Sequence, residues 1–355
     1  MRVLHLAAGN RWTGAAAPAF AEVEALRAAG VDAHYAYVGG YKLQAKLEHH
    51  DFAHPLIEKA QNPMTFVRSL GALDRMVHQH GFDVLHAHLT YDHWLARAVS
   101  RNHPRLRLAR TFHARRVLRS DVFTRSLIAR TAHLFAINDA FLGAPVFGGR
   151  EVTFTPPPLD HRQFTPAGGD VRAQYGIAPE TKLVTVIGKL SAGRGFEDAL
   201  RTFAELRAST TKVRLMIIGH GEHRPALETL SRELGVADDV LWAGYHEDDL
   251  AEHYRAADLL FFTARGSDEG HRAVLEAMAC GVPPAVYPIE GVLALTGRAH
   301  VASAAAPGAL AALAADLLAR EPEPLRRAVY QRSLEFGYPR AAERLMTAYD
   351  STRAS

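Results

Sequence analysis

The chain alternates short apolar runs with longer segments in which apolar and polar residues recur at helical spacing. In the first part of the chain this pattern predicts a helix over 15–29, which Gly30 ends, and further helices over 64–80 and 93–101. Short apolar runs predict buried strands over 3–7, 33–38, 84–86, 106–111, 134–137 and 152–154. Because strands that alternate with helices are typical of βαβ units, we expect a parallel sheet.

Three consecutive prolines, Pro156 to Pro158, interrupt this pattern, because proline removes a backbone donor and fixes φ. The alternation then resumes, with strands expected over 183–187, 213–218, 240–242, 259–262 and 285–287, and helices over 196–207, 222–234, 247–256 and 272–279. From about residue 309 the pattern is helical to the end, with interruptions near Pro322 and Gly337. We therefore expect one α/β domain over 1–155, a linker over 156–170, a second α/β domain over 171–336 and a terminal helix over 337–355.

Length and composition agree with two globular domains. At 355 residues, 48% hydrophobic and 22% charged, the chain is too apolar to be disordered. Its single cysteine, Cys280, excludes a disulfide framework and a thiolate metal cluster, which fits a reducing compartment. The N-terminal segment predicts a core strand and not a signal peptide, and no apolar run reaches the length of about 18 residues of a membrane span. We expect a cytoplasmic protein.

Charge divides unevenly along the chain. Residues 1–155 hold 19 Lys and Arg against 12 Asp and Glu, a net +7, whereas residues 156–355 hold 22 against 26, a net −4. The segment 101–130 contains nine arginines and a single acid, Asp121. Such a segment suits phosphate-bearing lipids, and the alternative is a solvated basic face. Because its aromatic residues are few, we expect no nucleic-acid partner.

The segment 265–283 contains the densest candidate chemistry, at the turn from a strand into a helix. The free backbone N–H groups at a helix start suit a phosphate or a polarised sugar oxygen. Asp268 and Glu276 are separated by seven residues and are placed to accept hydrogen bonds from vicinal hydroxyls of a sugar. The alternative is structural, with Asp268 capping the helix and Glu276 pairing with a base.

A second candidate, IGKLSAGRG at 187–195, places Lys189 and Arg194 around a glycine-rich turn before a helix. Two such cations can hold a diphosphate from both sides, unless the turn is a solvated loop.

The first loop, GNRWTG at 9–14, lacks the dinucleotide pattern GxGxxG. The short GHG at 219–221 is expected to turn the chain and not to bind a ligand.

The stretch HAHLTYDH at 86–93 resembles a metal-binding pattern only in part. Asp92 and His93 stand two residues too late for the di-metal hydrolase spacing, and no further ligand set stands out, so we expect no metal site. His88 lies at a predicted strand end, where it suits a hydrogen bond to a substrate hydroxyl or to neighbouring backbone. His113, after the 106–111 strand, has an equivalent position.

SDEGHRAVLEAMACGVP at 267–283 resembles the signature of family 4 glycosyltransferases, which are retaining enzymes of the GT-B fold. Further stretches are similar to family motifs in the same order: DVLHAH, TFHA, TPPPLD, IGKLSAGRG and IIGHGEHRPALETLSRELGVADDVLWAGY. The resemblance spans nearly the whole chain and is strongest over 183–290. The motif GSDxxxRAVLEAMA is similar to the motif of the family branch that acts on lipopolysaccharide cores and other cell-envelope glycans.

The resemblance implies two Rossmann-like domains that face each other across a cleft, with a C-terminal helix crossing back to the first. It implies that Lys189 and Arg194 hold the donor diphosphate and that Glu276 binds the ribose. Asp268 would bind the hydroxyls of the donor sugar, and His113 would contact that sugar near the reacting carbon. The residues around the second-domain turn, Gly270, His271 and Arg272, would approach the phosphate or sugar, and Gly14 would line the acceptor loop.

The activity implied is transfer of a sugar from a nucleotide sugar, UDP- or GDP-linked, to a glycan or glycolipid hydroxyl. No cofactor and no metal is expected, because the nucleotide sugar is a co-substrate. The basic first half suggests an anionic acceptor and peripheral contact with the inner face of the cytoplasmic membrane. Two alternatives are a non-catalytic nucleotide-sugar-binding subunit and a sugar-nucleotide epimerase of the same fold.

Overall fold

The computed structural model describes residues 1–10, 12, 14–264 and 270–351. The chain divides into two compact units, Met1–Pro158 with Phe336–Ser355, and Leu159–Glu335. We call them the N-terminal and the C-terminal unit. No helix in the described part of the chain is long and apolar enough to cross a membrane.

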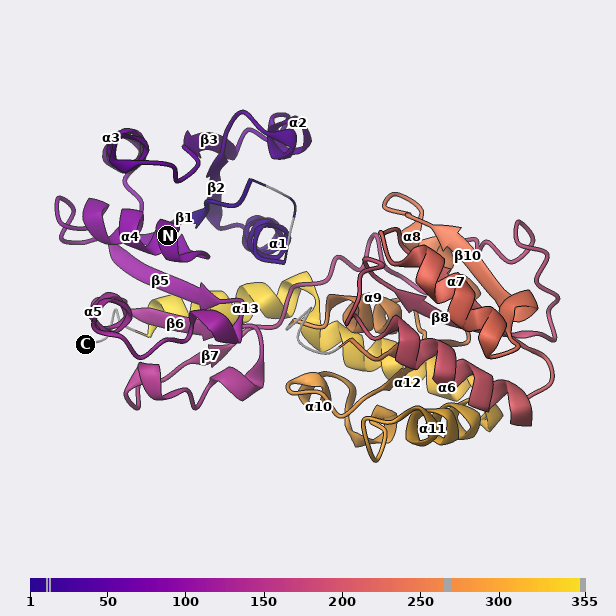
Figure 1. The fold of residues 1–355 in the computed structure, drawn as a ribbon. Helices are drawn as coiled ribbons and strands as arrows, with labels where there is room; N and C mark the ends of the chain where they lie inside the picture. Colours follow the sequence, from indigo (N-terminus) through magenta and orange to yellow (C-terminus); the bar gives the residue numbers. More distant parts are fainter. Residues whose placement is uncertain (11, 13, 265–269, 352–355) are drawn as a thin grey trace. The chain divides into compact units, whose positions relative to one another are not determined.

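The N-terminal unit is built on a parallel sheet whose described strands follow the order β3-β2-β1-β4-β5-β6-β7 (Figure 1). The strands are β1 Arg2–Ala7, β2 Asp32–Val38, β3 Ala53–Ile57, β4 Val84–Ala87, β5 Arg107–Phe112, β6 His133–Ala136 and β7 Thr153–Phe154. The helices are α1 Ala16–Ala28, α2 Lys42–Leu47, α3 Pro63–His80, α4 Thr90–Val99, α5 Val122–Ala129 and α13 Tyr338–Asp350.

Alternate residues of the first strand face opposite layers of this unit. Val3 and Ala7 share a buried cluster with residues of α1 and α13, whereas Leu4 and Leu6 pack with residues of α3 and α4. Because side chains alternate along a strand, His5 lies on the α1 and α13 side. The terminal helix α13 is thus part of the N-terminal core, through Ala341, Leu345 and Tyr349.

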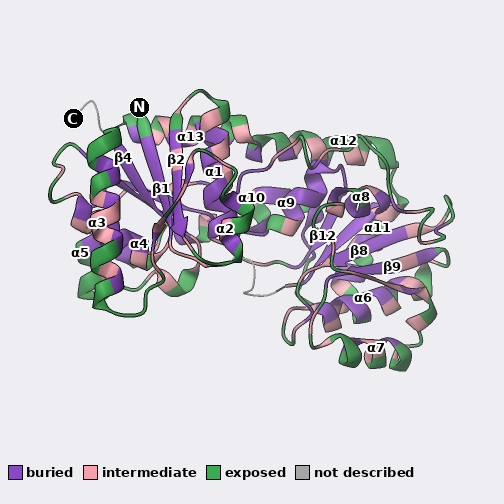
Figure 2. Ribbon diagram, turned by 90° about the horizontal axis from the view of Figure 1, so that it is seen from above, coloured by how far each residue is buried: buried purple, intermediate pink, exposed green. Residues whose placement is uncertain are grey.

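The C-terminal unit has a second parallel sheet, with the described strands in the order β10-β9-β8-β11-β12. These strands are β8 Lys182–Ile187, β9 Val213–Ile218, β10 Val240–Gly244, β11 Leu259–Phe262 and β12 Pro284–Val286. Its helices are α6 Phe196–Ser209, α7 Arg224–Glu233, α8 Leu250–Ala256, α9 Arg272–Ala279, α10 Val292–Thr296, α11 Pro307–Ala319 and α12 Pro322–Ser333. Figure 2 shows buried strands at the centre of each unit, while α3 and α7 expose one side.

The structure contains elements that the apolar pattern did not predict, namely α2, β3, α5 and α10. The strand β3 carries Pro55 and lies at the edge of its sheet, a position that tolerates proline but weakens the strand pattern. The helix expected from His93 begins at Thr90, because the Asp92 carboxylate accepts hydrogen bonds from the backbone amides of Ala8 and Leu89. Pro156, Pro157 and Pro158 are irregular, as expected, but they are buried.

Candidate functional site

In the C-terminal unit, the loop that follows β8 presents the two predicted cations. Lys189 lies just beyond the strand with 60% of its side chain exposed, and its Nζ is 3.8 Å from the exposed Glu222 carboxylate. An ion pair so open to water contributes little to stability. Arg194 is partly exposed, two residues before α6 begins. Both cations are therefore positioned near a helix start, where they remain accessible to an anion.

Glycine is required in this loop by close contact with the end of β11. Gly195 has a φ of 83°, and a Cβ there would lie 2.5 Å from the Thr263 carbonyl oxygen. The Thr263 hydroxyl in turn donates a hydrogen bond of 2.7 Å to the carbonyl of Gly195. The loop with the two cations is thus fixed against the strand that leads to the second candidate segment.

The GHG segment after β9 is a packing element. A Cβ on Gly219 would lie 1.9 Å from the Gly188 carbonyl oxygen, and one on Gly221 would lie 2.0 Å from that of Leu190. Leu190 also donates a backbone hydrogen bond to His220. These glycines let the ends of β8 and β9 approach each other closely, which agrees with the chain-turning role expected for them.

The start of α9 contains a strained residue. His271, immediately before the helix, has a φ of 49°, the single positive φ of a non-glycine residue in the described part of the chain. Its buried ring contacts the Glu290 carbonyl oxygen through Nε2 at 2.8 Å. Backbone strain of this kind costs about 1–3 kcal/mol and clusters at functional sites. Gly270, which precedes it, is buried, while Asp268 lies outside the described residues.

Glu276 extends from the first turns of α9 and is only 4% exposed. One carboxylate oxygen accepts a hydrogen bond from Nε of Arg272 at 2.6 Å, and the other accepts one from the Tyr254 hydroxyl at 3.2 Å. A carboxylate is an acceptor-only group, which suits hydrogen bonds from ligand hydroxyls. One turn later, burial raises the pKa of the Cys280 thiol to about 12, which makes it a poor nucleophile.

In the N-terminal unit, three predicted residues come together at the end of the sheet. His88 follows β4 and His113 follows β5, and the two rings contact each other at 2.9 Å between Nδ1 of His88 and Nε2 of His113. Burial, with the nearby Arg110, lowers the pKa of His113 to about 3, and a hydrogen bond with the Gly14 backbone opposes part of that shift. His113 is therefore neutral at physiological pH, able to exchange hydrogen bonds but not to act as a cation.

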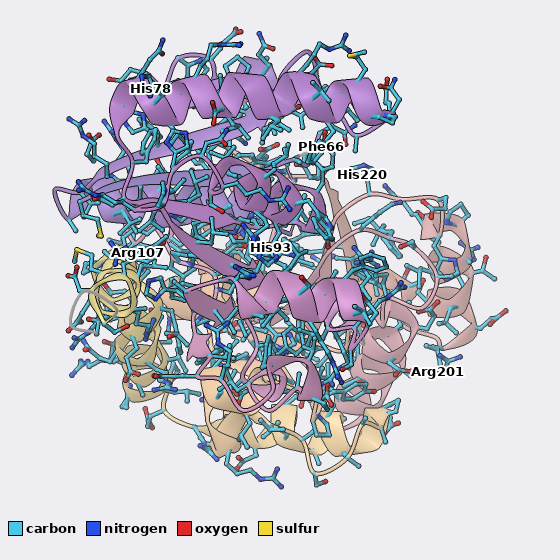
Figure 3. The ribbon with its side chains drawn as sticks, turned by 90° about the vertical axis from the view of Figure 1, so that its left-hand side faces the viewer. Phe66, His78, His93, Arg107, Arg201 and His220 are labelled. Atoms are coloured by element: carbon cyan, nitrogen blue, oxygen red, sulfur yellow. The ribbon has the colours of Figure 1, made fainter. Side chains whose placement is uncertain are left out.

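The remaining residues of the histidine-rich stretch have structural contacts. His93 lies within the unit on α4 (Figure 3) and is bonded to the Thr131 hydroxyl at 2.7 Å. His88 is fully buried, so this structure places it against His113 and not against solvent. Sequence reasoning missed two further buried residues beside it, His5 and Glu22. The sequence signal that could have identified them is a polar residue at a position where the pattern expects an apolar one: His5 in β1 and Glu22 in α1.

Comparison with solved structures defines the fold class. The chain is similar to Anabaena HepE in complex with UDP, with a TM-score of 0.82 at 16% identity over 99% of this chain and 100% of the other. At this identity the similarity shows the fold alone. The predicted class is confirmed, since the two parallel α/β units are those of GT-B proteins.

The family follows from the sequence of the C-terminal unit. Residues 169–334 match the family described as glycosyl transferases group 1. The match lies within the C-terminal unit and agrees with the resemblance identified from the motifs.

Two relatives of known name are similar over parts of the chain. A D-inositol 3-phosphate glycosyltransferase of Segniliparus rotundus is 30% identical over 214 residues, which cover 56% of this chain and 47% of the relative. A GDP-mannose-dependent alpha-(1-6)-phosphatidylinositol monomannoside mannosyltransferase of Mycolicibacterium smegmatis is 33% identical over 138 residues, 36% of each chain. The chain thus matches about half or less of these relatives' own length.

Proposed function

We propose that this chain is a retaining glycosyltransferase that moves a sugar from a nucleotide-sugar donor to a hydroxyl of a glycan or glycolipid. The observation that carries the proposal lies within the C-terminal unit. There, two accessible cations follow β8 and the buried Glu276 carboxylate follows β11, and these strands are direct neighbours in the sheet. In open α/β sheets, ligands bind at the carboxyl ends of the strands.

The donor fits these residues by its chemistry. Lys189 and Arg194 would hold the diphosphate, and Glu276 would accept hydrogen bonds from the ribose hydroxyls. The strained turn at Gly270 and His271, with Arg272, would present polar groups to the phosphate or the sugar, and Asp268 would bind sugar hydroxyls. HepE was solved with UDP and the mannosyltransferase relative uses GDP-mannose, so UDP- and GDP-sugars are the first donors to test.

The reaction needs no separate general base. The bond between the anomeric carbon and the diphosphate oxygen breaks, and the acceptor oxygen bonds to that carbon on the same face. The acceptor proton passes to the departing phosphate oxygen, while the cations stabilise the charge that develops on the diphosphate. His113, held neutral, would contribute a hydrogen bond to the sugar near the reacting carbon. On this account the transfer requires no added metal ion.

An anionic acceptor fits the charge of the N-terminal unit. Its residues carry 22 Lys and Arg against 14 Asp and Glu, a net +8, whereas the C-terminal unit has 19 against 24, a net −5. Both named relatives carry a phosphate-bearing inositol compound in their names. A phosphorylated glycolipid of the cell envelope, of the lipopolysaccharide or a related class, is the acceptor we propose.

Contact with a membrane is supported by two exposed apolar side chains in the arginine-rich segment. Val122 is 79% exposed and Phe123 71% exposed at the start of α5. Apolar side chains beside arginines suit the interface of an anionic bilayer. Replacing both by serine should weaken binding to vesicles that contain anionic lipid, whereas Val67→Ser on α3, 58% exposed, serves as the control. Equal binding to neutral and anionic vesicles would contradict this contact.

The proposed activity is tested by incubating the full chain with UDP-, GDP- and ADP-sugars and a panel of glycolipid acceptors. We expect nucleoside diphosphate release that depends on an acceptor, unchanged by brief EDTA treatment, and a product whose anomeric configuration by NMR matches that of the donor. Donor conversion without an acceptor would identify an epimerase. Donor binding without turnover on any acceptor would identify a binding subunit, and an inverted product would contradict the retaining mechanism.

A further inference from the structure

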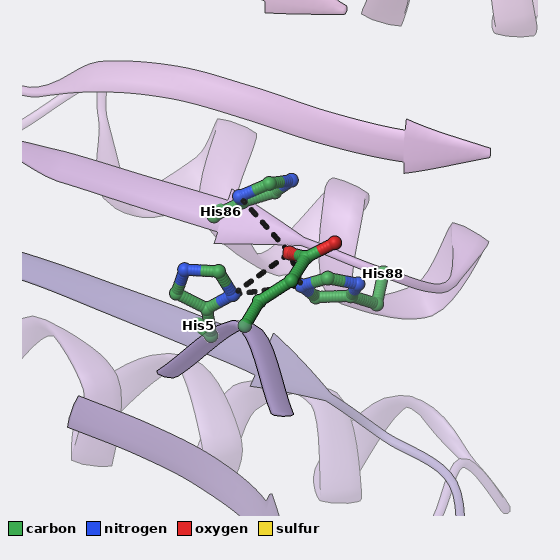
Figure 4. Close-up of side chains that lie close together, drawn as sticks. His5, His86 and His88 are labelled. Atoms are coloured by element: carbon green, nitrogen blue, oxygen red, sulfur yellow. Dashed lines mark hydrogen bonds and ion pairs between the residues drawn. The ribbon is translucent and has the colours of Figure 1, made fainter. Parts of the chain in front are cut away.

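Four polar side chains meet in the core of the N-terminal unit, on the side of the sheet that faces α1 and α13. His5 of β1 pairs in register with His86 of β4, His88 follows two residues later on the same side, and Glu22 extends from α1. Figure 4 shows the carboxylate among the three imidazole rings. All four residues are no more than 1% exposed.

The distances among these side chains suit a shared cation. Oε2 of Glu22 lies 3.5 Å from Nδ1 of His5, 3.6 Å from Nε2 of His88 and 3.9 Å from Nδ1 of His86. One candidate ligand atom from each residue lies within 4.8 Å of the others. A tetrahedral zinc ion with bonds of about 2.0–2.2 Å holds its ligand atoms about 3.3–3.6 Å apart. Nδ1 of His5 and Nε2 of His88 share a hydrogen bond of 2.9 Å, which zinc would replace as these two atoms move slightly apart.

The Glu22 carboxylate lacks other partners. Neither of its oxygens accepts a hydrogen bond from any residue that the structure describes. The buried carboxylate of Asp92, by contrast, accepts backbone hydrogen bonds from Ala8, His88 and Leu89. An unsatisfied buried acceptor costs about 1–3 kcal/mol, and more if it is charged. Glu22 is thus a buried carboxyl group without a hydrogen-bond partner among the described residues, surrounded by three imidazoles.

Each histidine has a second contact through its other ring nitrogen. Nε2 of His86 is 2.7 Å from the Thr111 hydroxyl, and Nδ1 of His88 is 2.9 Å from His113. Nε2 of His5 is 3.4 Å from the hydroxyl of Tyr349 on α13. Metal-ligating histidines typically make such outer contacts, which fix the ring and its tautomer. The Tyr349 hydroxyl also lies 2.6 Å from Nδ1 of His86, and metal binding would replace this contact.

The electrostatic setting favours neutral ligands. Burial lowers the pKa of all three histidines and raises that of Glu22. Unprotonated imidazole is the form that binds a metal ion, and a dication would compensate the carboxylate charge. The charge of Arg110 disfavours a cation here, since it also lowers the pKa of His86 and His88, but it interacts with the buried carboxylate of Asp92.

We propose that His5, Glu22, His86 and His88 form a closed, four-coordinate zinc site in the core of the N-terminal unit. Three imidazoles and one carboxylate form a donor set that suits Zn²⁺, and with no open position the site is structural. Zinc on Nε2 of His88 would leave Nδ1–H to donate to Nε2 of His113. His88 would then be a positioning residue for His113. The site does not depend on the proposed sugar transfer.

The first test is the metal content of the tag-free, full-length protein, measured by mass spectrometry after EDTA treatment in the folded state. Because the site is buried, the protein is also unfolded with chelator and refolded with one equivalent of ZnCl₂. We expect about one zinc per chain in both preparations, and a higher Tm than after refolding without metal. Less than about a tenth of an equivalent in both preparations would overturn the proposal.

Glu22→Gln locates the metal with little change of shape. We expect this variant to lose the zinc and to unfold at a lower temperature that no longer responds to zinc. The exposed His49→Gln should behave as wild type. If the cluster holds no metal, Glu22→Gln removes an unpartnered carboxyl group, and its Tm should be unchanged or higher. Zinc that survives Glu22→Gln but is lost in His246→Gln, in the second histidine group of the chain, would also overturn the assignment.

Discussion

The carboxyl ends of the strands carry opposite chemistry in the two units. In the N-terminal unit, the residues that follow β4 and β5, His88 and His113, are imidazoles whose pKa values are lowered by burial. In the C-terminal unit, the end of β8 leads to a lysine that is 60% exposed and a partly exposed arginine. The same architecture thus supports a closed, neutral cluster in one unit and an open, cationic loop in the other.

The comparison shows why net charge is a poor guide to where an anion binds. The N-terminal unit is basic overall, yet the imidazoles that follow β4 and β5 are neutral, whereas the acidic C-terminal unit presents the cations proposed to hold a diphosphate. Local placement at a helix start favours anion binding, whereas net charge acts on longer-range encounter. We accordingly propose the basic N-terminal unit as the part that contacts the acceptor and the membrane.

The largest expected effect concerns the backbone contact that shapes the cationic loop. Gly221→Ala would place a Cβ 2.0 Å from the Leu190 carbonyl oxygen, so the ends of β8 and β9 must separate. We expect a loss of about 4 kcal/mol in the free energy of unfolding, at the upper end of single-residue effects. Denaturant titration measures it. The control is Gly169→Ala, where a Cβ meets no atom within 4 Å, and equal stability of the two variants would contradict the packing role.

Glu276→Gln should mainly weaken binding of the nucleotide-sugar donor. The amide replaces one of the two acceptor oxygens and removes the charge that pairs with Arg272. Loss of a charge-assisted hydrogen bond to a ribose hydroxyl predicts about 30-fold weaker binding of a nucleoside diphosphate. Isothermal titration calorimetry gives the affinity, and circular dichroism checks that the variant is folded. Unchanged affinity in a folded variant would remove Glu276 from the site.

The buried imidazoles of the N-terminal unit predict acid sensitivity, for which His93 is the cleanest probe. Burial lowers its pKa to about 3, so between about pH 6.5 and 3 the unfolded chain binds more protons than the folded chain. The contribution of His93 to the free energy of unfolding is therefore fully present above about pH 6.5. It decreases as the pH falls and is about 2 kcal/mol smaller at pH 5.

His93→Gln should remove that share of the pH dependence. Urea titrations at pH 7.5 and pH 5 should show a difference in unfolding free energy that is about 2 kcal/mol smaller in His93→Gln than in wild type. The exposed His49→Gln is the matched control and should retain the full dependence. An identical pH dependence in His93→Gln and wild type would show that His93 is not neutral in the folded state.

Lys189→Ala is expected to have the smallest effect. Its exposed pairing with Glu222 adds little stability, so the Tm should not change. Loss of one charge-assisted contact to the diphosphate predicts about tenfold weaker donor binding. Because salt screens this contact, the difference between wild type and variant should become smaller as the salt concentration rises. Lys212→Ala, with 68% exposure in the same unit, should bind the donor as wild type does. Weaker donor binding in both Lys189→Ala and Lys212→Ala would indicate a general effect of net charge.

Most of the fold was predictable from the sequence, because buried parallel strands are short apolar runs between helices. The strand β3 was missed since Pro55 disrupts its run, and α2 since its six residues are too few for a clear helical pattern. The cations of the C-terminal unit were found because they follow one strand in sequence. His5 and Glu22 join His86 and His88 only through strand pairing and helix packing, which no spacing in the sequence reveals.

The most direct test of this contrast is hydrogen exchange of the wild-type chain with and without a saturating nucleoside diphosphate. We predict that the largest gain in protection falls on residues 188–196 and 270–279 of the C-terminal unit. Peptides that carry His5, His86 and His88 should already be protected without nucleotide. If no protection develops after β8 and at the start of α9 while the nucleotide is bound, the assignment of the donor to the C-terminal unit is wrong.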